Sequence, residues 1–384
     1  MLDRRTLLGA TAAGLLARPG WAADAPIKLG LVLPMTGPFA STGREIDAAC
    51  RLYLQQNPGR IEIVLRDDAG VADTTRRLVQ ELVVNDKVNV LAGFGLTPLA
   101  LAAAPLASKA KVPMVVMAAA TSAITEASPF VVRTAQAVPQ VAMPLGEWAP
   151  KNGIKKVVTL VSDYGPGQDA EKWFKEPFVK AGGAVPEALR VPLANPDFAP
   201  FLQRASDAAP DAVFIFVPSG VGAAFMKQFA ERGLKDKGVK LIGLGDVVDD
   251  ELLNSIGDVA LGTITSQHYS AAHDSPENKA FVAAFEAANP GMRPNFMAIG
   301  GWDGMALIDK AAAKAGPGAS GQALLDAMKG EKWTSPRGPI EIDAKTRDIV
   351  QNIYVRRTER VNGQLYNVEF ATIPMVHDPA KPAA

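Results

Sequence analysis

Two threonines stand where predicted strands of the N-terminal half turn into helices, in positions that suit a bound anion. Thr97 lies in the segment Gly93–Pro98, and Thr121 lies just after the run Met117–Ala120. A helix that begins with Thr-Pro leaves backbone N–H groups without partners inside the helix, and such groups attract carboxylates. Glycines beside them let a ligand approach the main chain. The pattern predicts a carboxylate site, although each threonine could equally be a plain helix cap.

Further turns of the same kind follow other predicted strands. They are Pro34–Gly43 with Phe39 and Ser41 in the first half, and Ser162–Gly167, Pro218–Gly220 and Gly243–Asp246 in the second half. The carboxyl ends of parallel strands share one edge of a sheet, and ligands bind at that edge. Phe39 is expected either to form a wall of a cleft or to pack under its own loop.

Predicted strands and helices alternate along the chain in two successive units. The first unit has strands at 27–33, 61–65, 88–92, 112–117 and 131–133, and the second has strands at 156–161, 184–191, 212–217 and 240–244. Apolar strands separated by helices predict parallel sheets covered on both faces. The expected fold class is therefore α/β, with two lobes that each contain a parallel sheet flanked by helices.

The last third of the chain departs from this rhythm. Helices are predicted at 276–288, 296–315 and 322–329, followed by two strands, 352–360 and 364–370. Asn362-Gly363 between these strands is a strong hairpin signal. The tail from Asp378 is expected to be frayed, and Cys50 is expected in the core of a helix.

Residues 1–25 resemble an export signal. Arg4 and Arg5 precede the short apolar run Thr6–Ala17, and small residues offer cleavage after Ala22 or Ala25. The run is too short for a membrane span, which needs about 20 residues. The paired arginines resemble a twin-arginine signal, with a general secretory signal as the alternative. Either route places the protein in the periplasm.

Composition narrows the function further. Lys and Arg together number 40, Asp and Glu together number 40, and the 384 residues include one cysteine. A chain without basic excess is a poor partner for nucleic acid. One cysteine cannot form an internal disulfide, and the length predicts about two domains.

Enzymatic motifs are missing from the sequence. The three histidines are His268, His273 and His377, and there is no Gly-x-Ser-x-Gly elbow, Walker loop or zinc-type spacing. His268, His273 and Asp274 could hold a metal, but such residues are more typical of an exposed loop. We expect no enzyme, no metal and no cofactor. An exported sensor that presents its ligand to a kinase remains an alternative.

Taken together, residues 27–370 resemble the type I periplasmic binding proteins of the Leu/Ile/Val transport class. The segments that carry the resemblance are Leu33–Pro38, Arg66–Asp68, Gly93–Pro98, Ala119–Thr121 and Ser162–Tyr164. The resemblance implies two lobes joined by three hinge crossings, which we place at 135–139, 266–269 and 338–346. The first lobe would comprise 26–137 and 268–340, the second 138–267 and 341–376, with 377–384 as a tail. The ligand would be trapped as the lobes close.

The resemblance also implies roles for single residues. Thr97 and Thr121 match the hydroxyls that hold a ligand carboxylate in the amino-acid binders. Their acidic partner for the ligand ammonium aligns with Gly245, next to Asp246, and their aromatic residue aligns near Gly165-Pro166, with Tyr164 displaced. A buried ammonium without a partner is costly. The sequence therefore resembles the branch that binds aromatic acids, with an amino acid as the alternative ligand.

The expected ligand is a small carboxylate, and the expected partner is an ABC permease in the inner membrane. The protein itself is expected to be a monomer and to bind no nucleic acid. Aromatic and apolar side chains would surround the ligand, and two residues near a crossing could donate to a distal hydroxyl. The predicted ligand-binding residues are Phe39, Ser41, Phe94, Gly95, Leu96, Thr97, Ala118, Ala119, Thr121, Tyr164, Gly165, Pro218, Ser219, Asp246, His268 and Tyr269.

Overall fold

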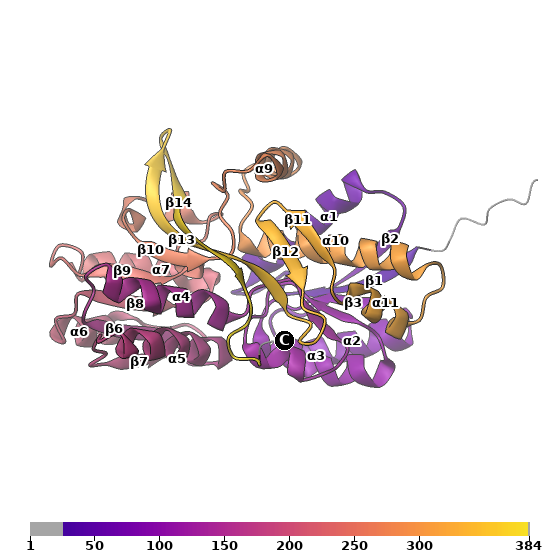
Figure 1. Ribbon diagram of the computed structural model, residues 1–384, viewed down its shortest axis with the longest axis horizontal. Coiled ribbons are helices and arrows are strands. Elements are labelled where there is room, and N and C mark those ends of the chain that lie inside the picture. The colour runs from indigo at the N-terminus through magenta and orange to yellow at the C-terminus, as the bar shows by residue number, and fades with distance from the viewer. Residues whose placement is uncertain (1–25, 383–384) are drawn as a thin grey trace, which may run out of the picture.

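A computed structural model describes residues 26–382, which fold into two α/β lobes that lie side by side (Figure 1). The predicted export signal at 1–25 lies outside the described residues. None of the helices between residues 26 and 382 is both long and apolar enough to cross a membrane. The α/β class and the two sheet-and-helix lobes predicted from the sequence are confirmed.

The first lobe is built on a parallel sheet in the order β2-β1-β3-β4-β5. Its strands are β1 (Ile27–Leu33), β2 (Ile61–Asp67), β3 (Val90–Gly93), β4 (Met114–Val116) and β5 (Val131–Arg133). The helices of this lobe are α1 (Ala40–Gln56), α2 (Ala72–Val84), α3 (Thr97–Ala110), α9 (Pro276–Ala288), α10 (Phe296–Ala315) and α11 (Gly321–Met328). Strands β3, β4 and β5 are wholly buried, as expected for a sheet that is covered on both faces.

The second lobe has a parallel sheet of β7-β6-β8-β9-β10 that is extended by antiparallel strands. Its strands are β6 (Val157–Ser162), β7 (Ala188–Val191), β8 (Ala212–Phe216), β9 (Lys240–Leu244) and β10 (Ile264–Gln267), and its helices are α4 (Val138–Lys151), α5 (Gly165–Lys180), α6 (Ala199–Asp207), α7 (Ser219–Glu231) and α8 (Leu253–Ile256). The predicted hairpin is confirmed, because β13 (Ile349–Val361) and β14 (Gln364–Val376) pair around a turn at Asn362-Gly363.

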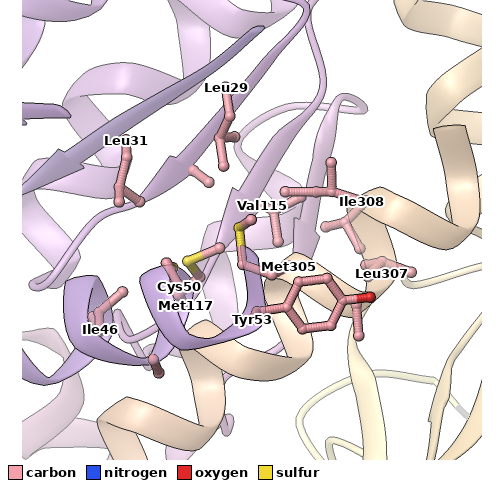
Figure 2. Packing of buried hydrophobic residues seen from close by; sticks show 14 of the residues in the cluster. Leu29, Leu31, Ile46, Cys50, Tyr53, Val115, Met117, Met305, Leu307 and Ile308 are labelled. Carbon is pink, nitrogen blue, oxygen red and sulfur yellow. The ribbon is translucent and has the colours of Figure 1, made fainter. Parts of the chain in front are cut away.

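The core of the first lobe forms where α1 and α10 meet the sheet (Figure 2). Cys50 is fully buried there, which confirms its predicted place. A β-carbon at Gly304 of α10 would lie 2.4 Å from the Cε of Met117, so glycine allows this close packing. Met117 follows β4, and α10 is thereby packed against the strand end that leads to Thr121.

The chain passes between the lobes three times before its C-terminal tail, which returns to the first lobe. The first two passages, after β5 and after β10, lie close to the predicted positions at 135–139 and 266–269. The third lies later than the predicted 338–346, a stretch that instead contains β12 (Gly338–Ile342), paired with β11 (Lys332–Ser335). Ile349 packs in the first-lobe core and Val355 in a second-lobe core, so the third passage lies within β13.

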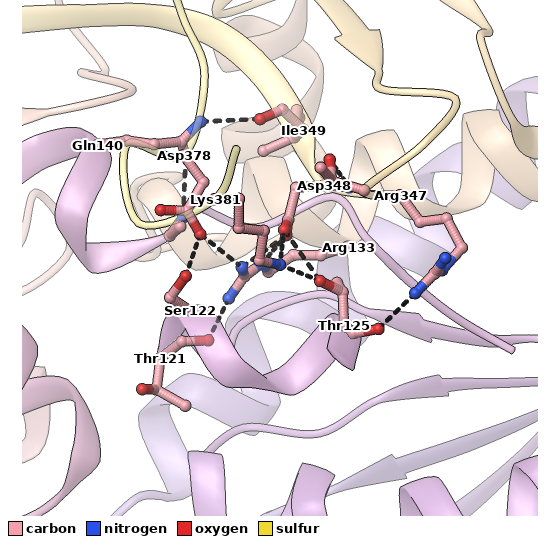
Figure 3. A network of polar contacts seen from close by, with 12 residues as sticks. Thr121, Ser122, Thr125, Arg133, Gln140, Arg347, Asp348, Ile349, Asp378 and Lys381 are labelled. Atoms are coloured by element: carbon pink, nitrogen blue, oxygen red, sulfur yellow. Dashed lines mark hydrogen bonds and ion pairs between the residues drawn. The ribbon is translucent and has the colours of Figure 1, made fainter. Parts of the chain in front are cut away.

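The C-terminal segment is held in place as far as residue 382, so the expectation of fraying was wrong for this part of the tail (Figure 3). Asp378 accepts a hydrogen bond from Ser122, and Lys381 forms an ion pair with Asp348. Asp348 also pairs with Arg133, with 2.5 Å between Oδ1 and Nη2. All five of these side chains are buried, which fixes the tail to the first lobe after it leaves β14.

Candidate functional site

A small cavity of about 30 Å³ lies between the lobes, where turns from the carboxyl ends of both sheets meet. It is lined by Thr42, Gly95, Leu96, Thr97, Ala118, Ala119, Ala120, Gln136, Tyr164, Pro166, Phe216, Pro218, Ser219, Asp246, Phe296 and Met297. A single water needs roughly 10–15 Å³, so the lobes are nearly closed on each other. Other cavities are larger, but this one collects the turns that follow the strands.

The start of α3 forms one end of the cavity. Phe94 has a φ of 64° and Gly93 a φ of 103°, which turns the chain sharply after β3. A β-carbon at Gly95 would lie 2.8 Å from the ring of Pro34, so these two turns approach each other closely. Among the described residues, no acceptor lies opposite the backbone N–H groups of Leu96 and Thr97. This end can therefore donate hydrogen bonds to an anion.

The two predicted threonines lie together at this end. The Thr97 hydroxyl oxygen accepts a hydrogen bond from the backbone N–H of Thr121 at 3.4 Å, which leaves its own hydrogen available to a ligand. The Thr121 hydroxyl donates to Asp169 of α5, in the other lobe, at 2.5 Å. Thr97 is thus the available hydroxyl donor in this closed arrangement, while Thr121 links the lobes.

Aromatic rings and a carboxyl group complete the cavity. Tyr164 stacks on Phe216 with ring centroids 6.3 Å apart. Burial, reinforced by the charge of Asp249, raises the pKa of Asp246 from 3.8 to about 7. The side chain of Gln267 donates to Asp246 over a long 3.4 Å. Within residues 26–382, no lysine, arginine or histidine lines this cavity.

A guanidinium group lies directly behind the turn after β9. A β-carbon at Gly245 would stand 2.1 Å from Nη2 of Arg356. Arg356 is buried, donates to the carbonyl oxygen of Tyr269 at 2.5 Å and lies 3.5 Å from Asp250. Position 245 is where the resemblance places the acid that would bind an ammonium group. In this chain a cation fills the space behind that position.

Most of the predicted residues come together at the cavity. Those that line it are Gly95, Leu96, Thr97, Ala118, Ala119, Tyr164, Pro218, Ser219 and Asp246. Thr121 and Gly165 stand just beside it, because a β-carbon at Gly165 would lie 3.4 Å from the Thr121 hydroxyl oxygen and 3.7 Å from Cγ2 of Thr97.

Three predicted residues point away from the cavity into the protein. Phe94 is fully buried between the first-lobe sheet and its helices, because the left-handed turn at this residue directs its side chain inward. Tyr269 packs edge-on against Phe281 in the other first-lobe core. His268 is buried behind the cavity wall, where its Nδ1 lies 2.9 Å from Oε1 of Gln136.

Two predicted residues of the first turn also lie outside the cavity. Phe39 is half-buried between the lobes, near Gly70 of its own lobe and Gly220 at the start of α7. Phe39 does not line the cavity, and it packs against a loop of each lobe instead of under its own loop alone. Ser41 is half-buried in the first turn of α1, and the next residue, Thr42, lines the cavity in its place.

Several lining residues were missed by sequence reasoning. Gln136 lies in the first passage between the lobes, and Phe216 is the last residue of β8. Phe296 and Met297 begin α10, whose sequence distance from every other part of the site hides their role. Thr42, Ala120 and Pro166 did carry a usable signal, because they lie inside turns that the sequence had already indicated.

The chain is similar to known proteins both in sequence and in structure. The chain matches the periplasmic binding protein family over residues 26–364. It belongs to this family. Membership makes it a solute-binding protein of the periplasm, in a family of binding proteins rather than of enzymes. Within the described residues, no group of three or more His, Cys, Asp or Glu side chains is placed to hold a metal ion.

Individual relatives of this periplasmic binding protein are similar over nearly their whole length. The Leu/Ile/Val-binding protein homolog 6 of Brucella melitensis is 42% identical, over 92% of this chain and 93% of the relative. A solute-binding protein of an ABC transporter from Rhodopseudomonas palustris BisB5, solved in complex with 3,4-dihydroxy benzoic acid, is 59% identical with a TM-score of 0.91. That alignment covers 93% of this chain and 99% of the other protein.

A second solved structure is also similar. It is an ABC-transporter solute-binding protein from R. palustris in complex with 4-hydroxybenzoate, which is 40% identical with a TM-score of 0.89. The alignment covers 93% of this chain and 99% of that protein. The fold of this chain therefore agrees with that of both solved structures over nearly their whole length.

Proposed function

We propose that this protein is the solute-binding component of an ABC importer and that it captures an aromatic carboxylate of the benzoate type between its lobes. The observation that carries the proposal is the composition of the cavity. It joins the unpaired N–H groups of Leu96 and Thr97 to three aromatic side chains, Tyr164, Phe216 and Phe296. Two relatives of 59% and 40% identity that were solved with hydroxylated benzoic acids support it.

The carboxylate of the ligand would bind at the start of α3. Two backbone N–H groups and the Thr97 hydroxyl can surround it there, as helix N-termini commonly do for anions. Neutral donors suffice, because their hydrogen bonds to a buried charge are strong. The ring would then lie among the aromatic side chains, and burial of its faces would contribute most of the affinity.

An amino acid is the second candidate ligand, favoured by the acidic Asp246 in the cavity and by the name of the Brucella relative. An α-ammonium group would need a fully charged acid that faces it. Burial works against that charge on Asp246, and the guanidinium of Arg356 behind Gly245 repels a second cation. The electrostatics therefore favour a ligand without an amine.

Binding would require the lobes to separate, because the closed cavity is too small for a ring. The three passages between the lobes, including the one within β13, would act as the hinge. The protein would work as a monomer and deliver its ligand to a permease in the inner membrane. Export by the twin-arginine route stays a prediction from Arg4 and Arg5.

A thermal-shift screen and calorimetry of the exported protein test the proposal. A benzoate-type acid at about 100 times its dissociation constant should add about 2.7 kcal/mol of stability, whereas leucine should add none. The variant Thr97→Ala should lose about 1–3 kcal/mol of binding free energy, because a hydroxyl bound to a buried charge is removed. The matched control is Thr334→Ala, an exposed threonine on β11.

The opposite outcomes are equally clear. A stability gain with leucine, isoleucine or valine and none with benzoates would identify an amino-acid binder. Equal affinity of the Thr97→Ala variant and the wild type for benzoates would remove Thr97 from the carboxylate site.

A further inference from the structure

The carboxyl group of Asp246 lines the same cavity as the start of α3 and can accept a hydrogen bond from a ligand. Asp246 lines the cavity and is only 6% exposed. Its Oδ2 receives the Gln267 amide at 3.4 Å, whereas its Oδ1 receives no hydrogen bond from another side chain among residues 26–382. A carboxyl oxygen can accept more than one hydrogen bond, so a ligand hydroxyl in the cavity that donates to Oδ1 would gain affinity.

A donor stands in the same wall of the cavity. Oε1 of Gln136 lies 2.9 Å from Nδ1 of His268, and Oε1 of Gln267 lies 3.0 Å from the same nitrogen. Two carbonyl oxygens can face this nitrogen only if it carries the hydrogen. The Gln136 amide oxygen is thereby directed at His268, and its Nε2 has no partner in the part of the chain that the structure describes.

These contacts form a hydrogen-bonded chain from Gln136 through His268 and Gln267 to Asp246. These hydrogen bonds fix the orientation of the Asp246 carboxyl group and of the Gln136 amide, so neither side chain rotates freely. A group that both donates and accepts hydrogen bonds would satisfy them together. A hydroxyl is such a group, whereas an ammonium only donates and a carboxylate only accepts.

Charge supports the same choice. The anionic end of the ligand belongs at Leu96 and Thr97, because a second negative charge beside Asp246 would be repelled. A cation there would lie near Arg356, whose Nη2 packs directly behind Gly245. A neutral hydroxyl on the ring meets neither penalty.

We propose that Asp246 and Gln136 form a subsite that selects aromatic carboxylates bearing a ring hydroxyl. The hydroxyl donates to Oδ1 of Asp246 and accepts from Nε2 of Gln136. This subsite rests on the proposed binding of an aromatic carboxylate, and it makes Asp246 and Gln136 the residues that set specificity.

Calorimetric titration of the exported protein with benzoate, 3-hydroxybenzoate, 4-hydroxybenzoate and leucine tests the subsite. The wild type should bind at least one hydroxylated acid about tenfold or more tightly than benzoate, as expected when an acceptor would otherwise stay unpaired. Asp246→Leu, of similar size, should bring that ratio close to one while benzoate still binds. Gln136→Met should lower the same ratio by a smaller factor.

Controls separate this subsite from its premise. Asp236→Leu, an exposed aspartate of the second lobe, removes the same charge and should keep the wild-type ratio. Should Asp246→Leu not fold, Asp246→Asn replaces it and should lower the ratio without abolishing binding. A wild-type ratio near one, or an unchanged ratio in both Asp246 variants, overturns the subsite alone. If no benzoate binds at all, the proposed function fails as well, and binding of leucine that is lost in Asp246→Leu would assign Asp246 to an ammonium.

Discussion

The buried charges beneath the C-terminal tail allow a quantitative test of what fixes the tail to the first lobe. Asp348 accepts from Nε of Arg133 at 2.7 Å and from the Thr125 hydroxyl at 2.9 Å, and it also pairs with Lys381 (Figure 3). The Asp348→Asn substitution would leave Arg133 and Lys381 buried, with only Asp378 near Arg133 at 3.7 Å. Removing one partner of a buried pair costs about 3–5 kcal/mol.

Urea unfolding of the wild type and the variant measures this cost. A loss of about 3–5 kcal/mol from a total of about 5–15 kcal/mol should move the midpoint far to lower urea, with little change in the slope. The control is Asp274→Asn, which removes an exposed partner of Lys279 and should leave the midpoint unchanged.

A second substitution sharpens the test. Lys381→Met in the Asp348→Asn background removes one of the two stranded cations, so the double variant should be more stable than Asp348→Asn alone. Such non-additivity is expected only for residues that share one interaction network. An unshifted midpoint for Asp348→Asn, or a double variant in which the two losses simply add, would refute the reasoning.

Two further predictions concern the turn after β9. Burial raises the pKa of Asp246 to about 7 and that of Asp250 to about 6, both above the ordinary 3.8. In the folded protein, each of these carboxyl groups is therefore favoured in its protonated form. The stability that this preference contributes is complete below about pH 4 and is lost as pH rises through about 6 to 7. Asp246→Asn should consequently gain stability relative to the wild type between about pH 5 and pH 8 in parallel urea titrations, and a constant difference would contradict this. Gly245→Ala should lose about 1–3 kcal/mol, because its β-carbon would overlap the guanidinium of Arg356. Equal unfolding midpoints would show that Arg356 moves aside freely.

Sequence reasoning predicted the regular part of the fold well, because that part depends on local signals. The bounds of β1, β5 and β9 agree with the prediction, since each is an apolar run ended by a change in polarity. The bounds of α9 and α10 agree because Ser275 and Asn295 cap them, each accepting from backbone N–H groups of the first turn.

Elements that depend on distant partners were missed. The segment Lys332–Ser335 has no strong strand pattern, and it becomes β11 only because β12 pairs beside it. The passage through β13 is invisible in sequence, since one continuous strand serves both lobes. The tail from Asp378 has the composition of a frayed end, but buried side chains of other segments hold it, namely Ser122, Arg133 and Asp348.

The site shows the same division between local and distant signals. Turns after strands identified Thr97, Tyr164 and Asp246, because the carboxyl ends of parallel strands share one edge. Nothing local could show that Arg356 would stand behind Gly245, since the two are 111 residues apart and meet only where β13 lies beside β10. No local signal could show either that His268 would be buried behind the cavity wall instead of facing the ligand.

The ion network beneath the tail and the ligand site are physically continuous. Arg133 donates from Nη1 to the carbonyl oxygen of Thr121 at 2.7 Å, and Ser122 beside it donates to Asp378 of the tail. The position of the Thr121 hydroxyl, which reaches Asp169 across the cleft, therefore depends on charges that the tail supplies. A variant that weakens the tail should thus weaken closure of the lobes as well as stability, because one loop carries both contacts.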